Sequence, residues 1–159
     1  MSDQADRAYI VALTLLSRRE LAEAQVRTRL ATRKFEDDDI DAALARLRRE
    51  RAVDDRRTAV ACARTQVRLR HRGRARVIRQ VEALGIDRDI AREAVAEVFA
   101  ELDEHALLEE ALDRRLRHGL SLGDPAVVRR VHRYLLGQGF DPGRVMALLR
   151  LRAKNPDAL

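Results

Sequence analysis

Apolar residues recur along the chain with the period of an α-helix. In the first stretch they stand at i, i+3, i+4 and i+7, namely Tyr9, Ala12, Leu13 and Leu16. The same spacing returns further along the chain in Ile40, Ala43, Leu44 and Leu47. This spacing places the side chains on one face of a helix, and no segment alternates apolar with polar residues as a strand does. The pattern predicts an all-α protein.

Three similar junctions divide the helical pattern. Each ends on a bulky apolar residue that is followed by an acid: Phe35-Glu36, Ile86-Asp87 and Phe140-Asp141. Phe35 and Ile86 are 51 positions apart, and Ile86 and Phe140 are 54 positions apart. A period of about 50 residues is typical of repeat arrays. We therefore predict three tandem three-helix repeats, helix-turn-helix-like units that pack into an elongated, curved array.

The junctions also set the boundaries of the repeats. The predicted repeats cover residues 1–53, 54–102 and 103–152, and residues 153–159 form a C-terminal tail. A segment of about 50 residues buries too little apolar surface to offset the entropy of ordering it. Each repeat is therefore expected to pack against its neighbours.

Local signals predict where individual helices begin and end. Asp124-Pro125 and Asp141-Pro142 each combine an N-cap acid with Pro at the first helical position. Gly85 is expected to end a helix in a left-handed conformation. Ser17 and Glu20 have the spacing of a capping box, which predicts that the second helix of the first repeat begins between them.

Basic charge is concentrated in the middle repeat. The chain has a net charge of +6 at pH 7, and no acid lies between Arg56 and Glu82. Such a band favours contact with a polyanion or with an acidic protein surface, although a solvated face in an arginine-rich chain is the simpler alternative. Charge alone does not distinguish nucleic acid from protein. The candidate contact residues are Arg64, Arg68, Arg70, Arg72, Arg74, Arg76 and Arg79.

The low aromatic content limits how this arginine-rich segment could bind nucleic acid. The chain has three Phe, two Tyr and no Trp. Binding of single strands usually depends on several exposed rings that stack on bases. Any DNA binding is therefore expected to be electrostatic, weak and strongly dependent on salt.

No pattern for catalysis, a metal or a cofactor is found. There is one cysteine, a Gly-rich phosphate loop is absent, and the acids at 36–39 suit the start of a helix better than an ion site. The four histidines have no ligand or nucleophile at a useful spacing: His71, His105, His118 and His132. We expect a protein that is no enzyme and that holds neither metal nor cofactor. Without a signal peptide or a long apolar run, it is expected to be cytoplasmic and without a membrane partner. We also expect a monomer.

Several segments, in order, resemble the RecX family of recombination regulators. They are residues 15–23 (LLSRRELAE), 53–59 (VDDRRTA), 72–78 (RGRARVI) with 84–86 (LGI), and 134–140 (YLLGQGF). The resemblance extends over roughly residues 7–150. Two departures are residues 25–30, where the family more often has a Glu-Leu pair and a lysine, and Arg74, where proline is common. Both departures keep the helical pattern and the positive charge, so the predicted fold is unaffected. The resemblance does not predict the contacts around Gly73.

The resemblance implies a modulator of RecA, the ATP-dependent recombinase that coats single-stranded DNA. The implied partners are RecA and the RecA–single-stranded DNA filament. Family members block filament growth, ATP hydrolysis, strand exchange and co-protease action, in recombination, DNA repair and the SOS response. The sequence leaves open whether this chain would cap a filament end or lie along the filament groove.

Two other classes of function remain open. Residues 9–47 could form a helix-turn-helix DNA-binding unit, although its third helix would bring the acids at 36–39 towards phosphates. The chain could also be a helical adaptor between proteins, without a DNA role.

Overall fold

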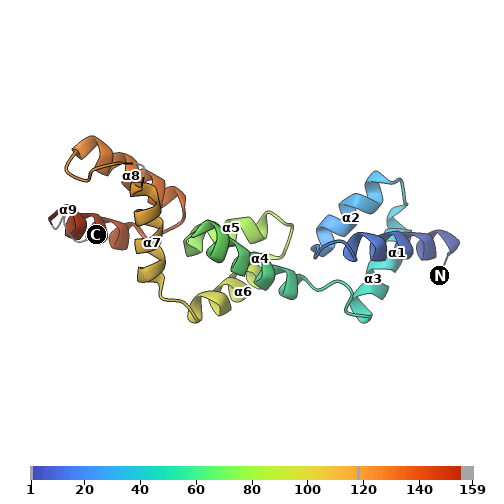
Figure 1. Ribbon diagram of the computed structural model, residues 1–159. Coiled ribbons are helices and arrows are strands. Elements are labelled where there is room, and N and C mark those ends of the chain that lie inside the picture. Colours follow the sequence, from blue (N-terminus) through green and yellow to red (C-terminus); the bar gives the residue numbers. More distant parts are fainter. Residues whose placement is uncertain (1, 118, 155–159) are drawn as a thin grey trace. The chain divides into compact units, whose positions relative to one another are not determined.

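The computed structural model describes residues 2–117 and 119–154, and all regular secondary structure in this part of the chain is helical (Figure 1). The predicted all-α class is confirmed. None of the helices in these ranges is long and apolar enough to cross a membrane. The described residues form nine helices: α1 (Asp3–Leu16), α2 (Glu23–Thr32), α3 (Asp37–Arg49), α4 (Asp55–Arg70), α5 (Arg74–Glu82), α6 (Arg88–Ala100), α7 (Glu104–Leu116), α8 (Pro125–Gly137) and α9 (Pro142–Lys154).

The helices belong to two compact units. Unit 1 combines Met1–Cys62 with Gln80–Ala94, and unit 2 combines Ala63–Arg79 with Val95–Leu159. The division passes through α4, α5 and α6, so the middle three helices contribute to both units. The repeat boundaries after residues 53 and 102 remain a prediction, and residues 155–159 of the predicted tail lie outside the described residues.

The core of unit 1 depends on small residues in α1. Ala8 and Ala12 are completely buried, together with larger aliphatic side chains such as Leu44 and Leu47 of α3. Because alanines let two helices approach closely, the buried face of α1 is centred on them. Leu13, predicted at the centre of that face, lies at its edge with 36% of its surface exposed.

Polar contacts also hold α1 to the end of α3. The Tyr9 hydroxyl donates a hydrogen bond of 2.5 Å to Glu50 Oε2, and the Arg46 guanidinium lies 3.8 Å from the centre of the Tyr9 ring. The hydrogen bond from Tyr9, together with that from Arg46, lowers the pKa of Glu50. The hydrogen bond to Glu50 in turn raises the pKa of Tyr9.

Most of the predicted helix ends are confirmed. Asp124 Oδ1 accepts a hydrogen bond of 2.8 Å from the Ala126 N–H, and Asp141 Oδ1 accepts one of 2.9 Å from the Arg144 N–H. Gly85 ends its helix in the left-handed region at φ 83°.

The capping box predicted at Ser17 is wrong. Ser17 follows the last residue of α1, and its hydroxyl donates to the Thr14 carbonyl at 2.9 Å. α2 begins at Glu23, where Gln25 Oε1 accepts a hydrogen bond of 3.1 Å from the Ala22 N–H. The helix starts late because the segment before it buries Leu21 in the core of unit 1.

A close backbone contact joins the third repeat to α5 within unit 2. The Gly73 N–H donates to the Gln138 carbonyl at 2.8 Å, and the Ala75 N–H donates to the Gly139 carbonyl at 3.2 Å. The first amides of α5 therefore satisfy carbonyls at the end of α8, groups that helix ends leave without partners. We call this contact the unit 2 joint. It requires glycine at two positions, because a Cβ at Gly139 would lie 2.3 Å from Arg76 N and one at Gly73 would lie 2.5 Å from Gly139 C.

A related contact lies in unit 1. A Cβ at Gly85, in the turn between α5 and α6, would lie 2.5 Å from the Ala24 Cβ near the start of α2. The Glu23 N–H donates to Asp55 Oδ1 at 2.8 Å, which ties the start of α2 to the start of α4. We call these two contacts together the unit 1 joint. In both joints the turn between two helices of one repeat packs on the start of the second helix of the preceding repeat.

Replacement of Gly139 by Ala should destabilise the protein by about 2–4 kcal/mol, from left-handed strain and from overlap with the backbone of Arg76. Gly137→Ala is the matched control, since nothing lies within 4 Å of its added Cβ, and it should be neutral or stabilising by up to about 1 kcal/mol. Urea denaturation followed by circular dichroism measures both. Equal stability of the two variants would contradict the close contact.

The Asp103 cap of α7 should make stability depend on pH. Hydrogen bonds from the Ala106 and His105 N–H groups lower the pKa of the Asp103 carboxyl in the folded chain. A lowered pKa gives stabilisation that is complete above the pKa of the unfolded chain and is lost as pH falls through the folded pKa. Asp103→Ala should therefore melt at a lower temperature at neutral pH, with a difference from the wild type that shrinks in acid.

Thermal melts of Asp103→Asn supply the control for this cap. Asn keeps an acceptor oxygen and caps helices as well as Asp does. The Asn variant should keep most of the stability at neutral pH while losing the pH dependence due to this group. If it melts as low as the Ala variant at every pH, the capping argument is wrong.

Candidate functional site

All the predicted contact arginines lie in unit 2, and their contacts divide them into two groups. α4 turns its buried stripe of Ala59, Ala63 and Val67 inward, which leaves Arg64 and Arg68 on the opposite side of the helix. The arginines around the start of α5 instead point into contacts with the rest of unit 2.

The first group lies around the start of α5, and two of its members, Arg74 and Arg76, bind residues across the unit 2 joint. Arg72 Nη1 donates to Gln66 Oε1 at 2.5 Å, and Arg76 Nη1 donates to the Gly137 carbonyl at 3.0 Å. Arg74 Nη2 lies 2.5 Å from Glu104 Oε1, and its guanidinium is 5.0 Å from the centre of the Phe99 ring. We call Arg72, Arg74 and Arg76 the joint arginines.

The second group projects into solvent. In the part of the chain that the structure describes, these side chains form no hydrogen bond or ion pair. Arg70 lies in the last turn of α4, where its positive charge interacts favourably with the helix dipole. Leu69, between two of them, is 68% exposed, so this end of α4 offers an apolar contact beside its charges. The solvent-facing arginines are Arg64, Arg68, Arg70 and Arg79.

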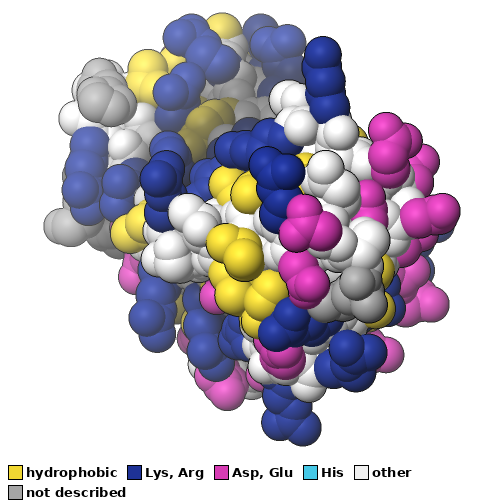
Figure 2. All heavy atoms as spheres, turned by 90° about the vertical axis from the view of Figure 1, so that its right-hand side faces the viewer, with side chains coloured by type: hydrophobic (Ala, Val, Ile, Leu, Met, Phe, Trp, Pro, Cys, Tyr) yellow, Lys and Arg dark blue, Asp and Glu magenta, His cyan; other side chains and the backbone are white. Residues whose placement is uncertain are grey.

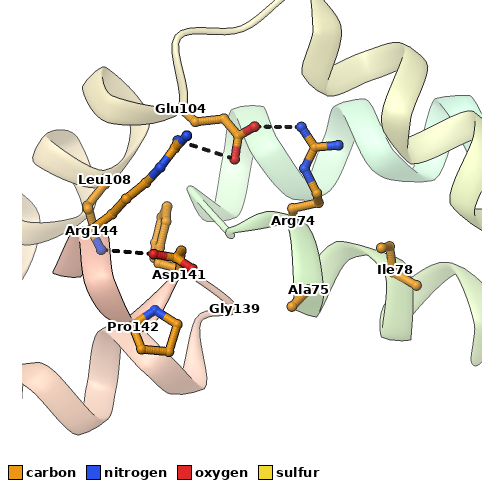
Figure 3. A pocket seen from close by; sticks show the side chains of 10 residues that line it. Arg74, Ala75, Ile78, Glu104, Leu108, Gly139, Asp141, Pro142 and Arg144 are labelled. Atoms are coloured by element: carbon orange, nitrogen blue, oxygen red, sulfur yellow. Dashed lines mark hydrogen bonds and ion pairs between the residues drawn. The ribbon is translucent and has the colours of Figure 1, made fainter.

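A half-open cavity of about 470 Å³ lies at the unit 2 joint (Figure 3). Arg74 and Arg144 approach the Glu104 carboxylate from two sides, at 2.5 Å and 3.9 Å. Asp141 is used to cap α9. The remaining wall is mainly apolar, formed by Ala75, Ile78, Leu108, Phe140 and Pro142 with Gly139. Both carboxylates at the cavity, those of Glu104 and Asp141, have partners in the protein, so the arrangement serves the joint.

His71 has polar neighbours that its sequence position did not indicate. Its Nδ1 lies 3.1 Å from Glu110 Oε2, and its Nε2 lies 2.9 Å from Arg114 Nη1. Because a guanidinium only donates, Nε2 is the acceptor in the contact with Arg114. These contacts span 39 and 43 residues, so no local spacing could have predicted them. His118 lies outside the described residues.

A second basic surface lies on α8. Arg129, Arg130 and Arg133 are all exposed, and no acid occurs between Asp124 and Asp141. The sequence held a signal for it, since this acid-free stretch resembles the longer one in the middle repeat.

Charge is more evenly mixed in unit 1. Its ion pairs include Arg48 with Glu23 at 2.8 Å and Arg57 with Glu20 at 2.6 Å. Figure 2 shows dark-blue basic and magenta acidic side chains interspersed on the face that it draws, around a group of yellow hydrophobic side chains. Among the described residues, no three His, Cys, Asp or Glu side chains are arranged to hold a metal ion.

Several known sequences similar to this chain carry the same description. The family model described as "RecX, first three-helix domain" matches residues 8–47. "Regulatory protein RecX" of Syntrophotalea carbinolica is 35% identical over 137 residues, which cover 84% of this chain and 88% of that protein. "Regulatory protein RecX" of Geobacillus kaustophilus is 30% identical over 93% of this chain, which spans only 55% of that longer protein.

Solved structures agree on the fold. The crystal structure of RecX from Lactobacillus salivarius superposes with a TM-score of 0.77 over 97% of this chain and 99% of that chain, at 19% identity. A second crystal structure of regulatory protein RecX superposes with a TM-score of 0.78 over 93% of this chain and 72% of that chain, at 22% identity. At these identities the superpositions establish the fold alone. With the Syntrophotalea relative matched over most of both lengths, the resemblance of the sequence is confirmed: the chain belongs to the RecX family of regulatory proteins.

Proposed function

We propose that this protein binds RecA and the RecA–single-stranded DNA filament and inhibits filament growth, ATP hydrolysis, strand exchange and co-protease action. The observation that carries the proposal is membership of a family whose relatives are named regulatory proteins. An all-helical array with exposed arginines supports it, because such arrays present extended binding surfaces. Acting on RecA, the protein would work in the cytoplasm, as a monomer and without chemistry of its own.

The solvent-facing arginines are the contact residues in this proposal. They can meet carboxylates of RecA or phosphates of the bound strand without breaking any contact recorded within unit 2. The joint arginines contribute indirectly, because removal of Arg74 would leave Glu104 without its closest cation. The predicted set of seven residues thus divides into four that contact the partner and three that shape the surface.

Direct DNA binding would be a minor contribution. Phe99 and Phe140 are 2% and 8% exposed, so their rings offer no stacking surface to a base. Tyr134 is more accessible, but the Arg115 guanidinium lies 4.8 Å from the centre of its ring. Binding through arginines alone follows counterion release and falls steeply with salt.

The helix-turn-helix alternative is less well supported. In the first repeat, α3 would have to enter the major groove, and its first turn carries Asp37, Asp38 and Asp39. Repulsion from phosphates opposes that approach.

Steady-state ATP hydrolysis by the cognate RecA on single-stranded DNA, at near-physiological salt, tests the proposal. With this protein titrated from far below to above the RecA concentration, we expect inhibition. Inhibition well below one molecule per RecA would indicate capping of filament ends, and inhibition only near saturation would indicate binding along the groove. No inhibition at any ratio would overturn the proposed function.

Reversal of charge at Arg64, Arg68 and Arg79 to Glu should raise the concentration for half-maximal inhibition by about tenfold or more, since each charge-assisted contact contributes about 1.5–3 kcal/mol. The matched control reverses three exposed arginines of the first repeat, Arg7, Arg19 and Arg49. The control should stay close to the wild type, and circular dichroism should show both variants folded. Unchanged inhibition by the first variant would remove these arginines from the contact surface.

A further inference from the structure

An exposed leucine lies among the solvent-facing arginines. Leu69 is in the last turn of α4 with 68% of its surface exposed, more than Ile10 at 61% or Leu151 at 54%. Single exposed aliphatic residues are common on protein surfaces and by themselves indicate nothing. Leu69 differs in its surroundings, because it lies between charged side chains that also have no partner in the described part of unit 2.

The helical geometry of α4 determines what lies beside Leu69. Successive residues are rotated by about 100° around the helix axis, so Arg68 and Arg70 project to its two sides. Arg64 lies one turn before Arg68 on the same side. Thr65, four positions before Leu69, is exposed and uncharged and lies almost in line with it along the helix. We call the strip of Thr65 and Leu69, together with Arg64, Arg68 and Arg70, the α4 patch.

The α4 patch faces away from the core of unit 2. The buried side of this part of α4, which includes Ala63 and Val67, lies on the other side of the helix. No acid occurs between Arg56 and Glu82, so the neighbouring sequence supplies no carboxylate to the three arginines. The free protein therefore keeps a hydrated leucine among cations that repel one another, and both features favour contact with a partner.

The leucine favours a protein partner over nucleic acid. Guanidinium groups bind both carboxylates and phosphates, so the arginines alone do not decide between the two. Burial of a leucine side chain is favourable only against an apolar surface, which the charged oxygens of a phosphate backbone do not provide. Stacking on bases would require an exposed ring, and the Phe99 ring beside Arg74 is only 2% exposed.

An apolar centre between charged edges is also the usual arrangement of a protein–protein contact. The central side chain loses its water on binding and contributes much of the affinity, while the charged rim fixes the orientation. Arginine is enriched in such interfaces. The matching surface has an apolar socket for one branched aliphatic side chain, with carboxylates around the socket.

We infer that the α4 patch is a protein-binding surface in which Leu69 is the apolar anchor, and that its partner has an apolar socket rimmed by carboxylates. The inference rests on the proposed function, because RecA is taken as the protein that carries this socket. It goes beyond that function by assigning Arg64, Arg68 and Arg70 to carboxylates of the protein rather than to phosphates of the bound strand.

The test is Leu69→Ala in the RecA ATP hydrolysis assay on single-stranded DNA at near-physiological salt. The concentration for half-maximal inhibition should rise by about tenfold, the factor expected from the loss of most of a buried leucine side chain. Leu69→Met, which retains most of the apolar surface, should recover most of the inhibition. Because Leu69 is exposed and Ala favours the helix, circular dichroism should show the Ala variant folded.

Ile10→Ala is the matched control. Ile10 lies in α1 and is 61% exposed, so its truncation removes a similar aliphatic surface outside the α4 patch. This variant should inhibit RecA as the wild type does. An equal loss in both Ala variants, or no loss in Leu69→Ala while the wild type inhibits RecA, would overturn the inference alone. A wild type that does not inhibit RecA would overturn the proposed function, and the inference would fall with it.

Binding to single-stranded and duplex oligonucleotides at low salt separates the two classes of partner. Leu69→Ala should bind both oligonucleotides as the wild type does, whereas Arg68→Gln should bind them more weakly, because arginine contacts release counterions. An aliphatic side chain can also wedge between base pairs. If Leu69→Ala loses oligonucleotide binding by as large a factor as it loses inhibition, Leu69 contacts DNA and the inference is wrong.

Discussion

The close approach of one helix end to another is the constraint on which the rest of this molecule depends. At the unit 2 joint, the first amides of α5 donate to carbonyls at the end of α8, so groups that each helix leaves without partners satisfy one another. The approach is possible only because Gly73 and Gly139 lack a Cβ. The joint arginines lie around this contact, and their guanidinium groups are already bound to other residues of unit 2.

Much of this fold could be read from local chemistry. The three junctions, the Pro-containing N-caps and Gly85 depend on residues close in sequence, and the structure confirms the caps at Asp124 and Asp141. The start of α2 could not be read in this way. Ser17 and Glu20 have suitable types and spacing, but the burial of Leu21 with the rest of the unit 1 core decides the local conformation. Tertiary packing thus overrode a valid local signal.

The candidate surface was predictable in composition but not in arrangement. A stretch without acids identified the arginines, yet only the folded chain separates Arg64, which faces solvent, from Arg74, which pairs with Glu104. The difference arises because Glu104 is 30 residues away in sequence. The neighbours of His71 were hidden for the same reason. Local sequence thus predicts which charges are present, and the folded unit decides which of them remain available.

The division of the middle repeat between the units has a consequence for synthesis. Unit 1 contains Met1–Cys62 and Gln80–Ala94, so its last part is made only after Ala63–Arg79, which belong to unit 2. A chain emerging from the ribosome therefore cannot complete unit 1 when its first repeat appears, and Ala24 waits uncovered until the Gly85 turn has been translated. Unit 1 can therefore fold completely only after most of the second repeat has been synthesised. A chain that ended after the first repeat would leave the start of α2, around Ala24, without the Gly85 turn that packs on it.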